Sequence, residues 1–204
     1  MQVFSDRTEA SEALTDHIQS RLKQELAVKE RVLFVASGGT SPVQCFELLS
    51  GRDLSWERVT VSLSDERCVP ADHPESNEKL VRDHMLRDKA SETGFLSPED
   101  DALAALMPAA CTLLGMGEDG HFASLFPDSD QLEQGLTSNS QAVRVVTPSS
   151  EFERISMTLP TLLNSKDIVL LVFGEKKKQV LQNSQGLPIE HLLKAADIKI
   201  FWAP

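Results

Sequence analysis

Short apolar runs alternate along the chain with segments in which apolar residues recur at helical spacing. A short, mainly apolar run is typical of a strand that is buried on both faces of a sheet. The strands predicted in this way are Val32–Ala36, Val59–Leu63, Ala109–Leu114, Ile168–Phe173 and Ile198–Trp202. Helical spacing predicts helices over Thr8–Lys29, Val43–Leu49, Lys79–Arg87 and Lys176–Leu181.

This alternation predicts the fold class. Strands that alternate with helices favour an α/β architecture, here a doubly wound, mainly parallel sheet with helices on both faces. Val143–Val146 and Arg154–Pro160 are predicted as additional extended segments, and the polar stretch Asp88–Asp101 as a loop. At 204 residues the chain is long enough for a sizeable core, and we expect one domain over residues 1–204.

The charge balance narrows the classes of partner. The formal net charge is −11, which disfavours nucleic acids and anionic membranes because both would be repelled. No apolar run approaches the length that a bilayer-spanning helix requires. A small anionic ligand is compatible with this charge if the site gathers its own cations. We therefore expect a small-molecule ligand, with neither nucleic acid nor membrane as a partner.

The cysteines and the N-terminal segment indicate the compartment. Cys45, Cys68 and Cys111 are widely spaced and form no C-x-x-C pair, so we expect reduced thiols rather than disulfides or a zinc site. The first residues lead directly into a charged amphipathic segment, without the pattern of a secretory signal. We expect a cytoplasmic protein that is a monomer or a weak homo-oligomer.

The stretch Leu113–Pro127 is the strongest candidate for chemistry. It begins as the end of an apolar run and continues as a glycine-rich turn, which lets the backbone approach a ligand closely. His121 follows the last glycine of the turn, and Asp119 lies two residues earlier. This position beyond the carboxyl end of a strand is where open α/β sheets bind ligands. The glycines are Gly115, Gly117 and Gly120.

Polar residues also follow three other predicted strands, and one precedes an extended segment. These candidates are the Gly38-Gly39-Thr40 turn, Asp65 with Arg67, Lys177 in the Gly174–Lys178 segment, and Arg154. Backbone N–H groups of a Gly-Gly turn before a helix suit a phosphate, although a plain tight turn is the alternative. A run of lysines can equally be a solvated face. Because the carboxyl ends of parallel strands share one edge, we expect these residues to converge.

Together these residues suit hydrolysis of a phosphorylated small molecule. Histidine has an ordinary pKa of about 6.5, so His121 is suited to take a proton from water near neutral pH. Asp119 could orient the ring and stabilise the imidazolium. Arginine and lysine suit a phosphate. The sequence contains no serine nucleophile elbow and no metal-ligand spacing, so we expect no metal.

Five motifs, in chain order, resemble those of the 6-phosphogluconolactonases. They are Ser37-Gly38-Gly39-Thr40-Ser41-Pro42, Ser64-Asp65-Glu66-Arg67-Cys68-Val69-Pro70 with Ser76-Asn77, Gly115–Pro127, Arg154–Pro160, and Gly174-Glu175-Lys176-Lys177. The resemblance covers the chain from about Val32 to Leu181. It implies a metal-free esterase without a cofactor, on the Rossmann-like fold of glucosamine-6-phosphate deaminase and ribose-5-phosphate isomerase.

The resemblance implies a role for each candidate residue. His121 would activate the water that attacks C1 of 6-phosphogluconolactone, and Asp119 would hold His121. The phosphate and the sugar would be bound by Gly38, Gly39, Thr40, Asp65, Arg67, Arg154 and Lys177. The oxyanion would be met by a cation or by backbone N–H groups of the turn formed by Gly115, Gly117 and Gly120, and both possibilities are open.

The chain departs from the family pattern in several places. The segment between Asn77 and Leu113 is shorter than expected, Ala110 stands in place of a usual aspartate, and Phe122 in place of a usual threonine. The chain stops just after Trp202, where members commonly continue with an acidic residue. These departures concern the peripheral helices and the substrate mouth rather than the catalytic residues.

Two rival functions remain from the sequence. A sugar-phosphate deaminase or isomerase on the same fold usually has a tyrosine after the Asp-Glu pair, where this chain has Arg67, and the Ser124–Pro127 segment also favours the lactonase. A non-catalytic sugar-phosphate sensor would normally carry a DNA-binding domain, but no helix-turn-helix or basic patch is visible.

Overall fold

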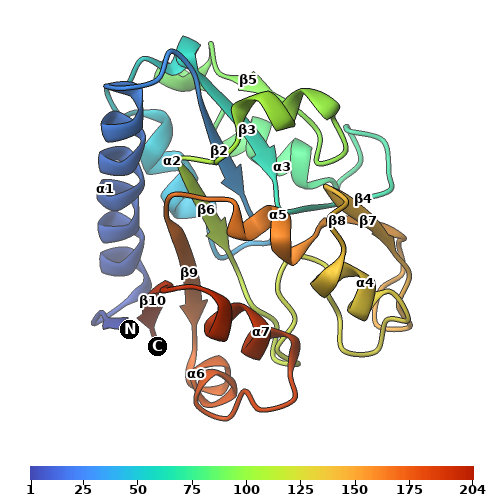
Figure 1. Ribbon diagram of the computed structural model, residues 1–204. Helices are drawn as coiled ribbons and strands as arrows, with labels where there is room; N and C mark the ends of the chain where they lie inside the picture. The colour runs from blue at the N-terminus through green and yellow to red at the C-terminus, as the bar shows by residue number, and fades with distance from the viewer.

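A seven-stranded parallel sheet forms the centre of the computed structural model, which describes residues Met1–Pro204 (Figure 1). The strand order is β1-β10-β9-β6-β2-β3-β5, and every neighbouring pair is parallel. The strands are β1 (Gln2–Val3), β2 (Val32–Ala36), β3 (Val59–Leu63), β5 (Gly94–Phe95), β6 (Cys111–Leu114), β9 (Ile168–Phe173) and β10 (Lys199–Ala203). The predicted α/β class with a mainly parallel sheet is confirmed.

Alternation along β2 shows why helices lie on both faces. Val32, Phe34 and Ala36 pack into one core cluster, whereas Leu33 and Val35 pack into a second. The first cluster includes residues of α1 (Arg7–Leu26), α2 (Val43–Ser50) and α3 (Asn77–His84). The second includes residues of α5 (Leu159–Leu163) and α7 (Pro188–Ala195). Each strand face is therefore covered by its own helices, as a continuously apolar strand requires.

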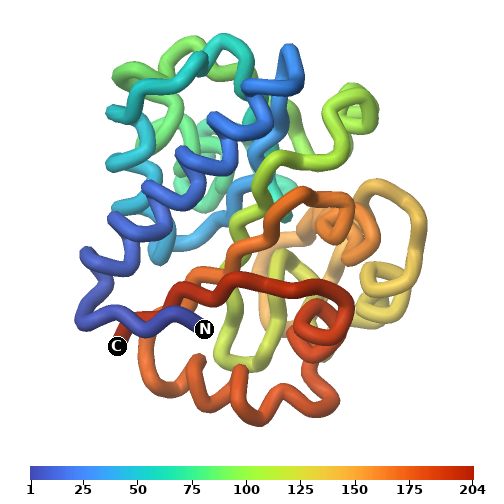
Figure 2. Tube along the Cα trace, turned by 60° about the vertical axis from the view of Figure 1, so that its left-hand side comes forward, coloured from blue at the N-terminus to red at the C-terminus, as the bar shows by residue number.

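A second, three-stranded antiparallel sheet lies beside the main one. The extended segments predicted at Val143–Val146 and Arg154–Pro160 supply two of its strands, whereas the third strand and the pairing were not predicted. It consists of β4 (Asp65–Arg67), β8 (Arg154–Met157) and β7 (Ala142–Val145), in the order β4-β8-β7. The register pairs Arg67 with Arg154. In Figures 1 and 2 this part of the chain, with α4 (Leu132–Thr137), lies on the side away from α1. The strands that pair are far apart in sequence, so local periodicity cannot predict the pairing.

Several smaller elements also differ from the prediction. Asp88–Asp101, predicted as a loop, contains the edge strand β5 and the 3-10 turn Asp88–Ala90. The short strand β1 and the helix α7 also had no predicted counterpart. The remaining elements are α6 (Glu175–Gln182) and the 3-10 helices Trp56–Arg58 and Asp101–Leu106. The edge strands β1 and β5 have only two residues each, which are too few for a periodic signal.

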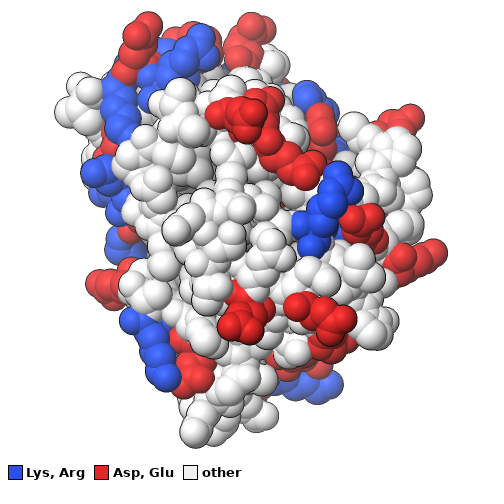
Figure 3. Space-filling view, turned by 45° about the vertical axis from the view of Figure 1, so that its right-hand side comes forward, with Lys and Arg blue, Asp and Glu red and all other residues white.

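The surface carries charges of both signs. On the face in Figure 3, basic side chains are interspersed with acidic ones, and a broad central area carries neither. The helices include none with the length and apolar character needed to cross a bilayer.

Candidate active site

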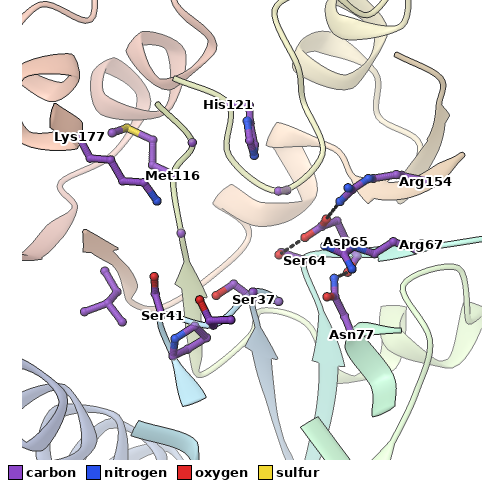
Figure 4. A pocket seen from close by; sticks show the side chains of 18 residues that line it. Ser37, Ser41, Ser64, Asp65, Arg67, Asn77, Met116, His121, Arg154 and Lys177 are labelled. Atoms are coloured by element: carbon purple, nitrogen blue, oxygen red, sulfur yellow. Dashed lines mark hydrogen bonds and ion pairs between the residues drawn. The ribbon is translucent and has the colours of Figure 1, made fainter. Parts of the chain in front are cut away.

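A cavity of about 290 Å³ lies at the carboxyl ends of the central strands (Figure 4). Its lining is mainly polar and includes residues from all four predicted strand ends and from β8. The candidate residues that line it are Gly38, Gly39, Thr40, Asp65, Arg67, Gly115, Gly117, His121, Arg154 and Lys177. The other two candidates do not line the cavity. Asp119 contacts the His121 ring through Nδ1, and Gly120 lies in the same turn. Convergence at one sheet edge is what the parallel topology dictates.

His121 and Asp119 form a hydrogen-bonded pair. Nδ1 of His121 lies 2.6 Å from Oδ1 of Asp119, and the same oxygen accepts the backbone N–H of His121 at 3.2 Å. Burial opposes ionisation of Asp119, but the hydrogen bonds from the side chain and backbone of His121, together with the charge of the ring, outweigh burial and hold the pKa of Asp119 below its ordinary value. The ring of Phe126 lies 4.3 Å from the His121 ring, centroid to centroid. With Nδ1 donating to the carboxylate, Nε2 is left as the acceptor, the form that a general base requires.

Gly117 is required by the close approach of this pair. A Cβ at position 117 would lie 2.3 Å from Nδ1 and Cε1 of His121 and 2.4 Å from Oδ1 of Asp119. The turn is closed by the N–H of Gly117, which donates to the carbonyl of His121 at 2.9 Å. Gly120 adopts a positive φ of 78°, and its carbonyl accepts from the N–H of Ile189 in α7. The glycines of the motif therefore make room for the His–Asp pair and tie the turn to its neighbour.

Three cationic side chains face the cavity from two sides. Arg67 and Arg154 extend from the second sheet, and Lys177 extends from α6 on the opposite side (Figure 4). Burial lowers the pKa of Lys177 from its ordinary value. Burial and the nearby charge of Arg67 likewise lower the pKa of Arg154. The flanking Lys176 and Lys178 turn elsewhere, so only one lysine of the run reaches the cavity.

The two flanking lysines have partners outside the site. Lys176 is 3.9 Å from the Glu118 carboxylate, and Lys178 lies 3.8 Å above the centre of the Trp202 ring. The alternative of a solvated face therefore holds for Lys176, while Lys177 lines the cavity.

The two arginines are held differently. Arg67 donates through Nη1 to the Glu75 carboxylate at 3.1 Å, and its buried Nε has no protein partner. Arg154 lies 3.7 Å from Oδ2 of Asp65 and stacks over the Phe126 ring at 5.4 Å. Because the planar guanidinium of Arg154 is held by Asp65 and Phe126, its remaining N–H groups point in a fixed direction.

Asp65 is almost fully enclosed by the protein. Its Oδ1 accepts from the Ser64 hydroxyl at 3.0 Å, and its Oδ2 accepts from the Ser124 hydroxyl at 2.6 Å. Asp65 is only 6% exposed. The neighbouring Glu66 accepts the N–H groups of Asn77 and Glu78 and so caps the start of α3. Both oxygens of Asp65 thus have protein partners, and the carboxylate is placed to hold Arg154.

Sequence reasoning assigned no role to several residues that line the cavity. These are Ser37, Ser41, Pro42, Ser64, Asn77, Met116, Ala123 and Leu171. The serines flank residues that were selected, so proximity in sequence was their signal. Asn77 had only the Ser76-Asn77 resemblance. Phe122, a departure from the family pattern, is fully buried in the core and does not line the cavity. No three His, Cys, Asp or Glu side chains gather into a set that could hold a metal ion.

Curated relatives match nearly the whole chain. It is 36% identical to the 6-phosphogluconolactonase of Caulobacter vibrioides over 224 residues, covering 100% of this chain and 97% of the relative. It is 35% identical to that of Pseudomonas aeruginosa over 228 residues, covering 100% and 94% respectively.

Solved structures and a family model agree with these relatives. A 6-phosphogluconolactonase from Shewanella baltica superposes with a TM-score of 0.93 at 31% identity, covering 100% of this chain and 97% of the other. That of Trypanosoma brucei, at 20% identity, shares the fold with a TM-score of 0.85, covering 99% of this chain and 95% of the other. The model for glucosamine-6-phosphate isomerases/6-phosphogluconolactonase matches residues 5–202. The chain therefore belongs to the glucosamine-6-phosphate isomerase/6-phosphogluconolactonase family, and the relatives that it matches over nearly their full length are 6-phosphogluconolactonases.

Proposed function

We propose that the chain hydrolyses 6-phospho-D-glucono-1,5-lactone to 6-phospho-D-gluconate, the second step of the oxidative pentose phosphate pathway. The observation that carries the proposal is the His121–Asp119 pair, which faces a cavity with cations on two other sides. A water-activating base beside an anion-binding surface is what hydrolysis of a phosphorylated ester needs. The relatives that the chain matches over nearly their full length are named 6-phosphogluconolactonase, which supports a 6-phosphogluconolactone as the substrate.

In this mechanism His121 acts first as a base and then as an acid. Its Nε2 takes a proton from water as the water oxygen attacks the lactone carbonyl at C1. The tetrahedral intermediate then collapses, the bond from C1 to the ring oxygen breaks, and the imidazolium returns the proton to that oxygen. Asp119 keeps Nδ1 protonated and stabilises the positive ring between the two steps.

The oxyanion of the intermediate needs a donor or a cation. Among the candidate N–H groups, that of Gly117 already donates to the carbonyl of His121, and that of Gly120 donates to the carbonyl of Gly117. This arrangement favours the Gly115 N–H or one of the cations.

We assign the phosphate to the cationic walls and the glycine turn. The Gly38-Gly39-Thr40 turn lines the cavity and precedes α2. Gly39 adopts a positive φ of 82°, and a glycine turn of this kind can present successive N–H groups to an anion. Arg67, Arg154 and Lys177 supply positive charge. Asp65, selected as a binding residue, contributes to this site by holding Arg154.

The proposal extends to the partners. We propose a cytoplasmic, metal-independent enzyme without a cofactor, which acts as a monomer or a weak homo-oligomer and binds neither nucleic acid nor membranes. Activity that survives exhaustive chelation is the expected result, and activity lost on chelation and restored by a divalent metal would contradict metal independence.

The test is hydrolysis of freshly generated lactone, followed in a pH-stat as acid production above the spontaneous rate. The wild type should accelerate the reaction, and His121→Ala should abolish the acceleration while keeping the wild-type melting temperature. Release of ammonia from glucosamine 6-phosphate, measured in parallel, reports the rival deaminase activity. No acceleration by the wild type, or full activity in His121→Ala, would refute the proposed function.

A further inference from the structure

Asn77 is a buried side chain in the wall of the cavity to which the proposed mechanism gives no role. It is the first residue of α3 and is 2% exposed. Its backbone N–H donates to Oε1 of Glu66 at 2.7 Å, and its Nδ2 donates to the carbonyl oxygen of Asp65 at 2.9 Å. The residue is therefore anchored to β4 through both its backbone and its side chain.

Gly38 presses against the same side chain from the phosphate turn. A Cβ at position 38 would lie 2.0 Å from Oδ1 and 2.4 Å from Nδ2 of Asn77. Any larger residue at position 38 would displace the amide of Asn77. The glycine at this position therefore allows the Asn77 side chain to pack directly against the turn. The amide plane is held between β4 on one side and Gly38 on the other.

The anchor also determines which way the amide points. A carbonyl oxygen can only accept, so the Asp65 carbonyl selects Nδ2, and Oδ1 faces the opposite way. No protein group donates a hydrogen bond to Oδ1, although Asn77 lines the cavity. Figure 4 shows this oxygen on the cavity side of the residue. An acceptor that is nearly buried and has no protein donor is satisfied by a ligand or by water.

We infer that Asn77 determines specificity by accepting a hydrogen bond from a ring hydroxyl group of the sugar lactone. The inference rests on the proposed function and adds a contact to it. A phosphate group is excluded from this position, because its oxygens are acceptors at neutral pH and would face another acceptor. The lactone offers hydroxyl donors at C2, C3 and C4. A site built to bind a hydroxyl group discriminates strongly against the analogue that lacks it.

The experiment compares the parent lactone with its 2-deoxy, 3-deoxy and 4-deoxy analogues, each generated by oxidation of the matching deoxyglucose 6-phosphate. The values of kcat/KM are measured for the wild type, Asn77→Ala and Asn77→Asp. Asn77→Ala should lose about 10-fold or more on the parent lactone. On one of the three analogues this loss should shrink to less than about threefold, because the hydroxyl partner is already absent.

Asn77→Asp separates the acceptor from the anchor. It keeps an oxygen toward the cavity and loses the donor to the Asp65 carbonyl, so it should melt at a lower temperature but still discriminate against the same analogue. Because aspartate also preserves the shape of the side chain, this variant keeps the inference testable if Asn77→Ala does not fold. Glu78→Gln is the matched control, since Glu78 pairs with Arg82 on the helix surface and should leave discrimination unchanged.

Equal losses on all four lactones, or no discrimination by the wild type, would overturn the inference and leave Asn77 as a purely structural anchor. Loss of discrimination in Asn77→Asp to the same extent as in Asn77→Ala would also overturn it. A different result would refute the proposed function, namely that the wild-type protein does not accelerate the hydrolysis of any of the four lactones.

Discussion

Replacing Gly117 by alanine is expected to disable the His121–Asp119 pair while the fold persists. The added Cβ would lie 2.3 Å from the His121 ring. To reach an ordinary separation of 3.4 Å, the ring must retreat by about 1.1 Å. The atoms in the way are side-chain atoms of His121 and Asp119, so the clash is relieved by moving the pair rather than the backbone. Because Gly117 does not need a positive φ, alanine adds no backbone strain.

The size of the effect follows from this displacement. A catalytic group misplaced by about 1 Å can cost about 100-fold in rate, and complete loss of a general base typically costs about 10²- to 10⁴-fold. We therefore expect kcat of Gly117→Ala to fall by at least about 100-fold in the pH-stat assay. Thermal unfolding, followed by circular dichroism, should change by only a few degrees.

Gly51→Ala is the matched control for this substitution. Gly51 also has a negative φ, ends α2 away from the cavity, and has its nearest atom 3.8 Å from the added Cβ. This variant should keep wild-type kcat. A folded Gly117→Ala enzyme with kcat within threefold of the wild type would refute the reasoning, because the pair could then move by an ångström without consequence.

Three further predictions test the charges. Asp119→Asn should lower kcat by about 10²- to 10⁴-fold, because the His121 imidazolium loses its counter-charge. A kcat near the wild-type value in the pH-stat assay would contradict the role of Asp119 in stabilising His121. Lys177→Ala should mainly raise KM. Burial lowers the pKa of Lys177, so the affinity of the wild type for the product, measured by calorimetry, should weaken as the pH rises through that lowered pKa. An affinity that does not depend on pH would count against a contact between Lys177 and the phosphate. Burial opposes ionisation of Asp167, but hydrogen bonds from His17 and Lys199 hold its pKa below the ordinary value, so its contribution to stability is present above the unfolded-state pKa and is lost as the pH falls through the lowered one. The free energy of unfolding of Asp167→Asn, measured with urea as a function of pH, should lack this acid-dependent component. If its pH profile matches that of the wild type, Asp167 contributes nothing to the pH dependence of stability.

The central strands were predictable because their signal is local. Strands such as β2, β3 and β9 are buried on both faces, so each reads as a short apolar run whose bounds the structure reproduces. Their parallel arrangement then places the strand ends at one edge, which is why His121 and the Gly38-Gly39-Thr40 turn could be linked from sequence. The strand β4 had no such signal, because its polar residues form a strand only by pairing with β8.

The fold class, the family motifs and the candidate residues at the strand ends could all be read from the sequence. How those residues are used depends on their packing in the folded chain. Three adjacent lysines look alike in sequence, but successive residues of a helix point in directions about 100° apart, so only Lys177 reaches the cavity. Asp65 meets Ser124 and Arg154, and Asn77 meets Gly38, across contacts between distant segments. Such contacts depend on the packing of whole elements, and periodicity along the chain carries no information about them.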